Sequence, residues 1–325
     1  MRRLNLVLAT MSSASETTKD LEQIARRVEE MDARIRAVVL RNSPAHRLAH
    51  AALWAAPTLS VAMQRTGPRT LLPGKLLTSR TLLKHGEYNR LEKAGFAVPR
   101  WTLVGPDTVL DPAEWGPYVV EKPDSGGRGA YVRIRRTGRV KYTQPESLSL
   151  DHFGRRGMLV QEFIFTGEWP QSYRVMTLLG QTILCMHQTT VGRGKPLSGR
   201  WGFGKDSGTS IISNTMDMDV TLVKDPEVMA LCEAAHRAAF PDVPLLGFDV
   251  IRDAETGRLY ILECHSHGPL WPFSSTRGRG IDERNGIEMA SQFNAIEKCS
   301  EIFAEATPRL AVRRMPFQTV EGSWT

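Results

Sequence analysis

The sequence predicts a chain of mixed class, with a parallel α/β unit at the N-terminus and α+β units after it. Residues 4–9 and 35–40 are apolar runs, and residues 21–31 between them carry apolar side chains at helical spacing. This order is typical of two parallel strands joined by a helix. Further along, apolar runs separated by short glycine-containing turns predict antiparallel hairpins, and the clearest of them covers residues 245–268.

The composition is that of a globular protein with an excess of positive charge. The chain has 325 residues, of which 41% are hydrophobic and 24% are charged, and its formal net charge is +7. This charge fits either solubility or an anionic ligand such as a nucleotide or an acidic substrate. Because the basic residues form scattered pairs and no long run, nucleic acid is the less expected partner. No apolar run approaches the roughly 18 residues of a membrane span, so none is predicted.

The cysteines indicate a reducing compartment. The chain has 4 cysteines, all in apolar segments and without CxxC spacing, namely Cys185, Cys232, Cys264 and Cys299. This pattern predicts buried free thiols and no disulfide framework or zinc site. The expected location is therefore the cytoplasm.

The segments that follow the N-terminal unit predict a helix, a linker and a second helix. Residues 45–56 are rich in Ala and Leu, which favours a helix. Residues 68–74 contain two prolines and a glycine, which is typical of a linker. Residues 84–95 predict a helix that is closed by Gly95.

A glycine-rich turn follows the strand that ends at Lys122. The turn contains Gly126, Gly127 and Gly129, and residues 131–134 predict the next strand. Glycine lets backbone amides approach phosphate oxygens closely, and the lysine adds a point charge for the same anion. Since such turns also occur in ordinary hairpins, these residues alone leave a phosphate loop and a structural turn open.

A second hairpin and a basic loop come next. Residues 158–188 contain a strand that reaches Glu162 and a hairpin that turns near Gly180. Arg174 lies on an apolar strand and requires an anionic partner, which either Glu162 or a ligand phosphate can supply. Residues 191–208 are rich in glycine and basic side chains without periodicity, which predicts either a flap over an anion or a solvated surface loop.

Two helices flank the hairpin at residues 245–268. Asp225 and Pro226 are typical of the N-cap and first position of a helix, which is predicted to reach about Phe240. Residues 288–303 carry an apolar stripe that predicts a closing helix. The tail from Pro308 onward is expected to be loosely ordered.

The hairpin places three polar side chains on one face. Because strand side chains alternate, Glu263 and His265 share a face, and a turn centred on residues 254–256 places Asp249 diagonal to Glu263 on that face. Burying two carboxylates among apolar neighbours costs roughly several kcal/mol per ion unless positive charge compensates. A divalent cation or a salt-bridged pair can provide that charge, and both alternatives stay open.

The order of these segments resembles the ATP-grasp superfamily, which includes D-alanine–D-alanine ligase, glutathione synthetase and the glutamate ligase that modifies a ribosomal protein. The resemblance covers residues from about 80 to 303. It is carried by Lys84 before the turn GFAVP, VVEKP with GGRG, VQEFI, SYRV, the basic glycine-rich loop, and GFDVIRD with TGRLYILECH. No single piece is decisive, but the ordered set is specific.

The resemblance implies a fold in which two α+β units clamp ATP after a parallel N-terminal α/β domain. The implied domains are residues 1–80 on the substrate side, 81–165 with the glycine-rich loop, and 166–325 with the metal site. The implied reaction is the ATP-dependent activation of a small-molecule or peptide carboxylate as an acylphosphate, which an amine or a thiol then attacks. Dimers are common among such proteins, so a homodimer is one expectation.

The resemblance also implies site residues, position by position. Those at the ATP phosphates are Lys84, Lys122, Gly126, Gly127 and Gly129. Those at adenine are Glu162, Phe163 and Ile164, and Glu168 is the nearest acid for ribose because Ser172 stands where the family has an acid. Arg174 matches a basic residue close to the active site, and the candidates on the basic flap for holding the carboxylate or the forming phosphate are Arg193, Lys195 and Arg200. Those at Mg²⁺ or Mn²⁺ are Asp249, Glu263 and His265.

His265 is the main departure from the family, which has Asn at this position. An imidazole nitrogen favours softer metals such as Mn²⁺, whereas an Asn oxygen suits Mg²⁺. His265 therefore ligates a metal, contacts phosphate or substrate, or marks a weakened nucleotide site. Two alternatives to a ligase stay open, namely an ATP-grasp kinase for a small molecule and a non-catalytic binder of nucleotides or nucleic acid.

Overall fold

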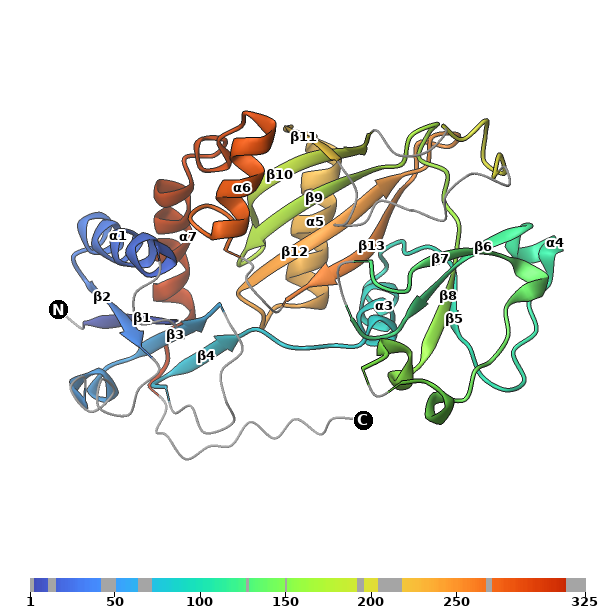
Figure 1. The fold of residues 1–325 in the computed structure, drawn as a ribbon. Helices are drawn as coiled ribbons and strands as arrows, with labels where there is room; N and C mark the ends of the chain where they lie inside the picture. The colour runs from blue at the N-terminus through green and yellow to red at the C-terminus, as the bar shows by residue number, and fades with distance from the viewer. Residues whose placement is uncertain are drawn as a thin grey trace.

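The structure is a computed structural model, and Figure 1 shows its fold. The residues that it describes are 3–10, 16–41, 51–63, 72–126, 129–149, 151–191, 196–203, 218–266 and 271–313.

A parallel four-stranded sheet, in the order β2-β1-β3-β4, forms the N-terminal part of the chain. Its strands are β1 (Leu4–Thr10), β2 (Ile35–Arg41), β3 (Thr58–Ala62) and β4 (Lys75–Thr78). The predicted β-α-β unit is confirmed, with α1 (Glu16–Met31) between the first two strands. The sequence pattern did not predict β3 and β4, because both are short and β4 follows directly on the expected linker.

Two other expectations for this part are revised. Of the helix predicted at residues 45–56, the described portion is a short 3-10 helix, η1 (Ala51–Ala55), and residues 45–50 lie outside the described residues. The linker predicted at residues 68–74 falls within them only from residue 72 onward.

The C-terminal helix α7 (Ala295–Leu310) returns to the N-terminal sheet, where it lies beside α1 (Figure 1). Phe303 and Ile302 are buried in one core with Leu6 and Ile24. Val312 then forms an isolated antiparallel bridge with Thr58. The expectation of a loosely ordered tail from Pro308 is therefore wrong as far as residue 313, because apolar packing continues the helix through this proline.

A second sheet, in the order β5-β8-β6-β7, is antiparallel and forms the central part of the chain. Its strands are β5 (Trp101–Leu103), β6 (Tyr118–Pro123), β7 (Arg133–Arg136) and β8 (Met158–Glu162). The helices of this part are α3 (Lys84–Lys93), α4 (Pro112–Trp115) and the short 3-10 helices η2 (Thr137–Arg139), η3 (Pro145–Ser147) and η4 (Phe153–Arg156). Figure 1 shows α3 between this sheet and β13 of the next one.

The third sheet is antiparallel, in the order β11-β10-β9-β12-β13. Its strands are β9 (Gln171–Leu178), β10 (Gln181–Thr190), β11 (Met218–Leu222), β12 (Leu245–Arg252) and β13 (Leu259–His265). The predicted hairpins β9–β10 and β12–β13 are both confirmed. The remaining elements are α6 (Thr276–Asn285) and the 3-10 helix η5 (Met289–Ser291), so the helix predicted at residues 288–303 begins later and ends later than expected.

Helix α5 (Pro226–Ala239) covers one face of this sheet (Figure 1). Asp225 caps it as predicted, since its Oδ1 accepts hydrogen bonds of 3.1 Å from the amides of Glu227 and Val228. Phe248 and Val250 of β12 point toward α5 and are fully buried in its core. Because side chains alternate along a strand, Asp249 points to the opposite face, away from α5.

The four cysteines are free and buried, which confirms the prediction of buried thiols. Within the described ranges, no helix combines the length and the apolar character that crossing a membrane requires.

Candidate functional site

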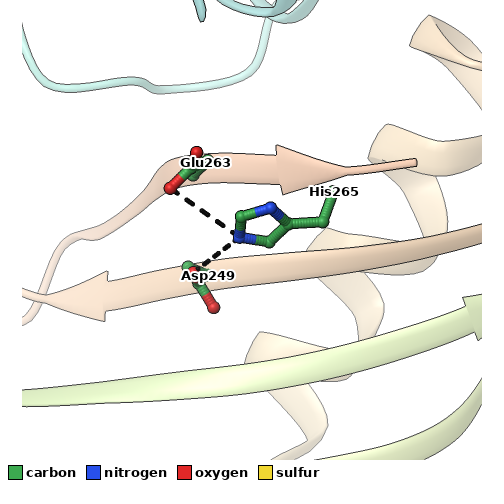
Figure 2. A group of neighbouring side chains, drawn as sticks. All are labelled: Asp249, Glu263 and His265. Carbon is green, nitrogen blue, oxygen red and sulfur yellow. Dashed lines mark hydrogen bonds and ion pairs between the residues drawn. The ribbon is translucent and has the colours of Figure 1, made fainter. Parts of the chain in front are cut away.

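Asp249, Glu263 and His265 lie together on the face of the third sheet that is turned away from α5 (Figure 2). The Nε2 atom of His265 is 3.1 Å from Asp249 Oδ2 and 3.7 Å from Glu263 Oε2. One ligand atom from each residue lies within 4.8 Å of the other two. Two carboxylates and an imidazole nitrogen at this spacing form a donor set that fits a divalent cation.

A β-bulge decides that these side chains share a face. Val250 of β12 pairs with Ile261 of β13, and the residue before it, Asp249, pairs with Glu263. Leu262 therefore has no partner on β12 and is an extra residue in β13. The prediction that Asp249 and Glu263 share a face is confirmed. The expected diagonal arrangement is wrong, because the bulge places the two carboxylates directly opposite each other.

Each carboxylate also has a cationic partner. Arg174 of β9 lies opposite Asp249 of β12 and makes a two-pronged ion pair with it, with 2.8 Å between Nη2 and Oδ2. Lys84, at the start of α3, lies with its Nζ 2.8 Å from Glu263 Oε1. The sequence offered Glu162 or a ligand phosphate as the partner of Arg174, and the structure shows Asp249 instead.

The surrounding charges keep both carboxylates ionised. Burial opposes ionisation of Asp249, but Arg174 and His265 outweigh it and hold the pKa of this carboxyl below its usual range. Burial likewise opposes ionisation of Glu263, and the charges of His265 and Lys84 outweigh it, so that its pKa is also lowered. Ionised oxygens are the form in which carboxylates bind metal ions.

The pKa of Glu87, on the same helix as Lys84, is shifted in the opposite direction from those of Asp249 and Glu263. Burial raises the pKa of its carboxyl well above the usual range, and the negative charge of Glu263 raises it further. Its Oε2 accepts a hydrogen bond of 3.3 Å from the backbone amide of Cys264. Burial therefore disfavours a further negative charge at Glu87, and its contact with the Cys264 amide supports the backbone of β13.

Lys122 of β6 is buried beside the cluster. Its Nζ donates hydrogen bonds to the Tyr88 hydroxyl at 2.7 Å and to Gln161 Oε1 at 2.8 Å. Burial lowers its pKa to about 8, although the charge of Glu263 works in the other direction. Sequence patterns did not single out Tyr88 or Gln161, and the only signal for Tyr88 is its position one helical turn after Lys84 on the same face.

The glycine-rich turn lies next to Lys84, whose Nζ is 3.3 Å from the carbonyl oxygen of Gly126. Gly126 and Gly129 have φ values of 118° and 69°, which other residues rarely adopt. A Cβ on Gly126 would also come within 2.9 Å of the Phe153 ring. Glycine is therefore required at position 126 for two reasons, and Gly127 lies outside the described residues.

The predicted nucleotide-binding segment follows β8. The Glu162 amide donates to the carbonyl of Arg100 at 2.8 Å, and Phe163 and Ile164 are buried. The side chain of Glu168 is exposed. These contacts do not test the assignment to adenine and ribose, which stays a prediction.

Arg200 lies at the turn of the β12–β13 hairpin. Its guanidinium donates to Asp253 Oδ2 at 2.6 Å and to Glu255 Oε2 at 2.8 Å. Both acids belong to the turn, so the described contacts of Arg200 stabilise the hairpin, and its catalytic role stays a prediction. Arg193 and Lys195 lie outside the described residues.

No protein-family model and no curated protein matches the sequence. Among solved structures, the D-cycloserine synthetase DcsG is 14% identical, with 93% of this chain and 99% of that chain covered and a TM-score of 0.50. The RiPP-associated ATP-grasp ligase of Chryseobacterium gregarium is 10% identical, with 97% and 100% covered and a TM-score of 0.49. The D-alanine–D-alanine ligase of Bacillus anthracis is 14% identical, with 94% and 99% covered and a TM-score of 0.45. Identities this low show the fold alone, and the likeness to DcsG confirms the fold that the sequence motifs indicate: this chain has the ATP-grasp fold.

Proposed function

We propose that this protein is an ATP-dependent ligase that activates a small-molecule or peptide carboxylate as an acylphosphate and joins it to an amine. The observation that carries the proposal is the charge of the site. Three cations, Lys84, Lys122 and Arg174, surround the two carboxylates of Asp249 and Glu263. This excess of positive charge on an ATP-grasp fold suits the polyanionic phosphates of ATP. Several solved proteins that this chain resembles are named as ligases or synthetases.

Asp249, Glu263 and His265 are the residues that would hold Mg²⁺ or Mn²⁺. A cation bound by these residues would neutralise negative charge on the phosphoryl group that is transferred. Arg174 and Lys84 neutralise the two carboxylates in this structure, and they would share these carboxylates with a cation held there. The salt-bridged pair and the metal site that the sequence left open are then two states of the same cluster.

Lys122 and Lys84 would bind the ATP phosphates, together with backbone amides of the turn that holds Gly126 and Gly129. Phe163 and Ile164 would bind adenine. The substrate carboxylate oxygen attacks the γ-phosphorus, the bond to ADP breaks, and an acylphosphate forms. The amine then attacks the acyl carbon and phosphate leaves. Positioning and electrostatic stabilisation account for most of the acceleration in such phosphoryl transfers.

The first test is release of ADP in the presence of Mg²⁺ or Mn²⁺ with a panel of small carboxylates and short peptides, with and without hydroxylamine. Hydroxylamine traps acylphosphates as hydroxamates. We expect ADP release that depends on one class of carboxylate and is accompanied by a hydroxamate. ADP release without any hydroxamate would instead indicate a kinase, and the absence of both ADP release and ATP binding would indicate a non-catalytic protein.

His265→Asn tests whether the imidazole selects the metal. Because nitrogen favours Mn²⁺ over Mg²⁺, we expect the ratio of Mn²⁺ to Mg²⁺ affinity to fall about tenfold in this variant. The measurement is the electron paramagnetic resonance signal of free Mn²⁺, followed by displacement with Mg²⁺. His187→Asn, on β10 of the same sheet, is the matched control and should leave the ratio unchanged. An unchanged ratio in His265→Asn would place His265 outside the coordination shell of the metal.

A further inference from the structure

Tyr88 lies at the junction of α3, the central sheet and the third sheet. The residue is fully buried, and the centroid of its ring is 5.5 Å from that of Trp101. Its hydroxyl points away from this apolar contact toward the polar groups of the site. A buried tyrosine needs hydrogen-bond partners for its hydroxyl, and here these partners come from three different strands.

The first partner is the bulge of β13. The Tyr88 hydroxyl donates a hydrogen bond of 2.8 Å to the carbonyl oxygen of Leu262, the extra residue of that bulge. If β13 continued in the register that pairs Val250 with Ile261, Glu263 would point to the same face as Ile261, toward α5. A slip of one residue moves side chains to the other face of a sheet. The bulge is therefore the local feature that places Glu263 beside Asp249.

The other two partners lie on the central sheet. The Tyr88 oxygen accepts a hydrogen bond of 2.7 Å from Lys122 Nζ and one of 3.2 Å from Gln161 Nε2. A hydroxyl offers one donor and two acceptor positions, so these two partners and Leu262 use all three. One oxygen atom thus fixes both the lysine on β6 and the bulge on β13.

Two other hydrogen bonds hold the outer edge of β13, on either side of the contact between Tyr88 and Leu262. Ile261 donates its amide to the carbonyl of Ala97 at 3.0 Å, and Cys264 donates its amide to Glu87. The contact from Tyr88 to Leu262 lies between these two bonds. It is therefore the contact in this series that acts on the bulged residue itself.

We propose that Tyr88 is a positioning residue, whose hydroxyl holds the β13 bulge that brings Glu263 to Asp249 and at the same time orients Lys122. The inference rests on the proposed function, because it takes Glu263 as a metal ligand and Lys122 as a phosphate-binding group. It predicts that removing one buried oxygen atom, at a residue outside the proposed set of metal ligands, weakens metal binding.

The test compares Mn²⁺ affinity, measured from the electron paramagnetic resonance signal of free Mn²⁺ without nucleotide, in the wild type and in Tyr88→Phe. We expect the affinity to fall about tenfold, as is typical when a group that supports a metal ligand is lost. Phenylalanine keeps the ring and its contact with Trp101, so we expect a cooperative melting transition. Tyr260→Phe is the matched control, because it lies on the same strand, its ring packs against Arg258, and its hydroxyl takes no part in this network.

A second variant, Tyr88→para-aminophenylalanine, restores a donor toward the Leu262 carbonyl. The amino group is a poor acceptor for Lys122 and Gln161, so we expect it to recover only part of the Mn²⁺ affinity lost in Tyr88→Phe, and a loss of packing alone would not produce this recovery. Wild-type affinity in Tyr88→Phe would overturn the role of Tyr88 while leaving the proposed function intact. A wild-type protein that binds neither Mn²⁺ nor ATP would overturn the proposed function, and the inference with it.

Discussion

Glu263→Gln is expected to lower ATP turnover at least about a hundredfold while the protein stays folded. Glutamine has the shape of glutamate but is neutral, so the site loses one of its two anionic ligands for a divalent cation. Its amide oxygen can still accept the hydrogen bond from Lys84, whose Nζ lies 2.8 Å from Glu263 Oε1. Because the shape and this contact remain, the change acts on the chemistry and not on the packing.

The measurement is ADP release at saturating ATP, with circular dichroism and thermal melting as checks on the fold. Glu121→Gln is the matched control. Glu121 is a buried carboxylate that forms an ion pair with Arg135, but it lies on β6 next to Lys122 in sequence and so points to the other face of that strand. We expect near-wild-type turnover in this variant. Equal losses in both variants would trace the effect to a lost buried ion pair and remove Glu263 from the metal site.

Sequence patterns were sufficient to predict those elements that are fixed by residues close together in the chain. Asp225 followed by Pro226 predicts the start of α5, because capping and the fixed φ of proline act within one turn. The turn of the β12–β13 hairpin was likewise predictable. Asp253 accepts hydrogen bonds from the amides of Glu255 and Thr256, and Gly257 adopts a φ of 73°.

The register of that hairpin could not be read from the sequence. The turn alone leaves the alignment of the strands uncertain by one residue, and this difference decides whether Asp249 faces Glu263 or lies diagonal to it. The groups that contact the bulge and its edge, Tyr88 and Glu87, lie on α3, and Tyr88 is 174 residues from its partner Leu262. Such contacts exist only after the third sheet has packed against α3.

The same reasoning applies to the charges of the site. The sequence identified Asp249, Glu263, Lys84, Lys122 and Arg174 individually, from their positions at strand ends, on an apolar strand or within family motifs. It could not assign the pairs, because Arg174 meets Asp249 across strands β9 and β12, and Lys84 reaches Glu263 from a helix of the preceding part of the chain. Pairing of this kind depends on tertiary packing, for which periodicity carries no signal.

Lys122→Met is the second change with a large expected effect, and we expect ATP turnover to fall at least about a hundredfold. Methionine fills most of the space of the buried lysine stem but removes the charge that would meet the phosphates. The Tyr88 hydroxyl and Gln161 lose one partner but keep each other, at 3.2 Å. Lys93→Met is the control, because Lys93 lies exposed in the last turn of α3 and its loss removes the same charge from the protein.

The pKa of Lys122 adds a pH dependence that separates its role from packing. Burial lowers this pKa to about 8, so the free protein loses the lysine proton as pH rises from 7 to 9. In the proposed site, ATP binds the protein in which Lys122 is charged. Wild-type ATP affinity should therefore fall as pH rises through about 8, by up to about tenfold for each further pH unit. Lys93→Met should keep this slope, whereas Lys122→Met should bind ATP weakly and with little dependence on pH. A titration calorimetry series that shows the same slope in Lys122→Met and the wild type would assign the pH dependence to another group. Lys122 would then be a buried structural lysine, and the phosphate site would have to rest on Lys84 and the glycine-rich turn.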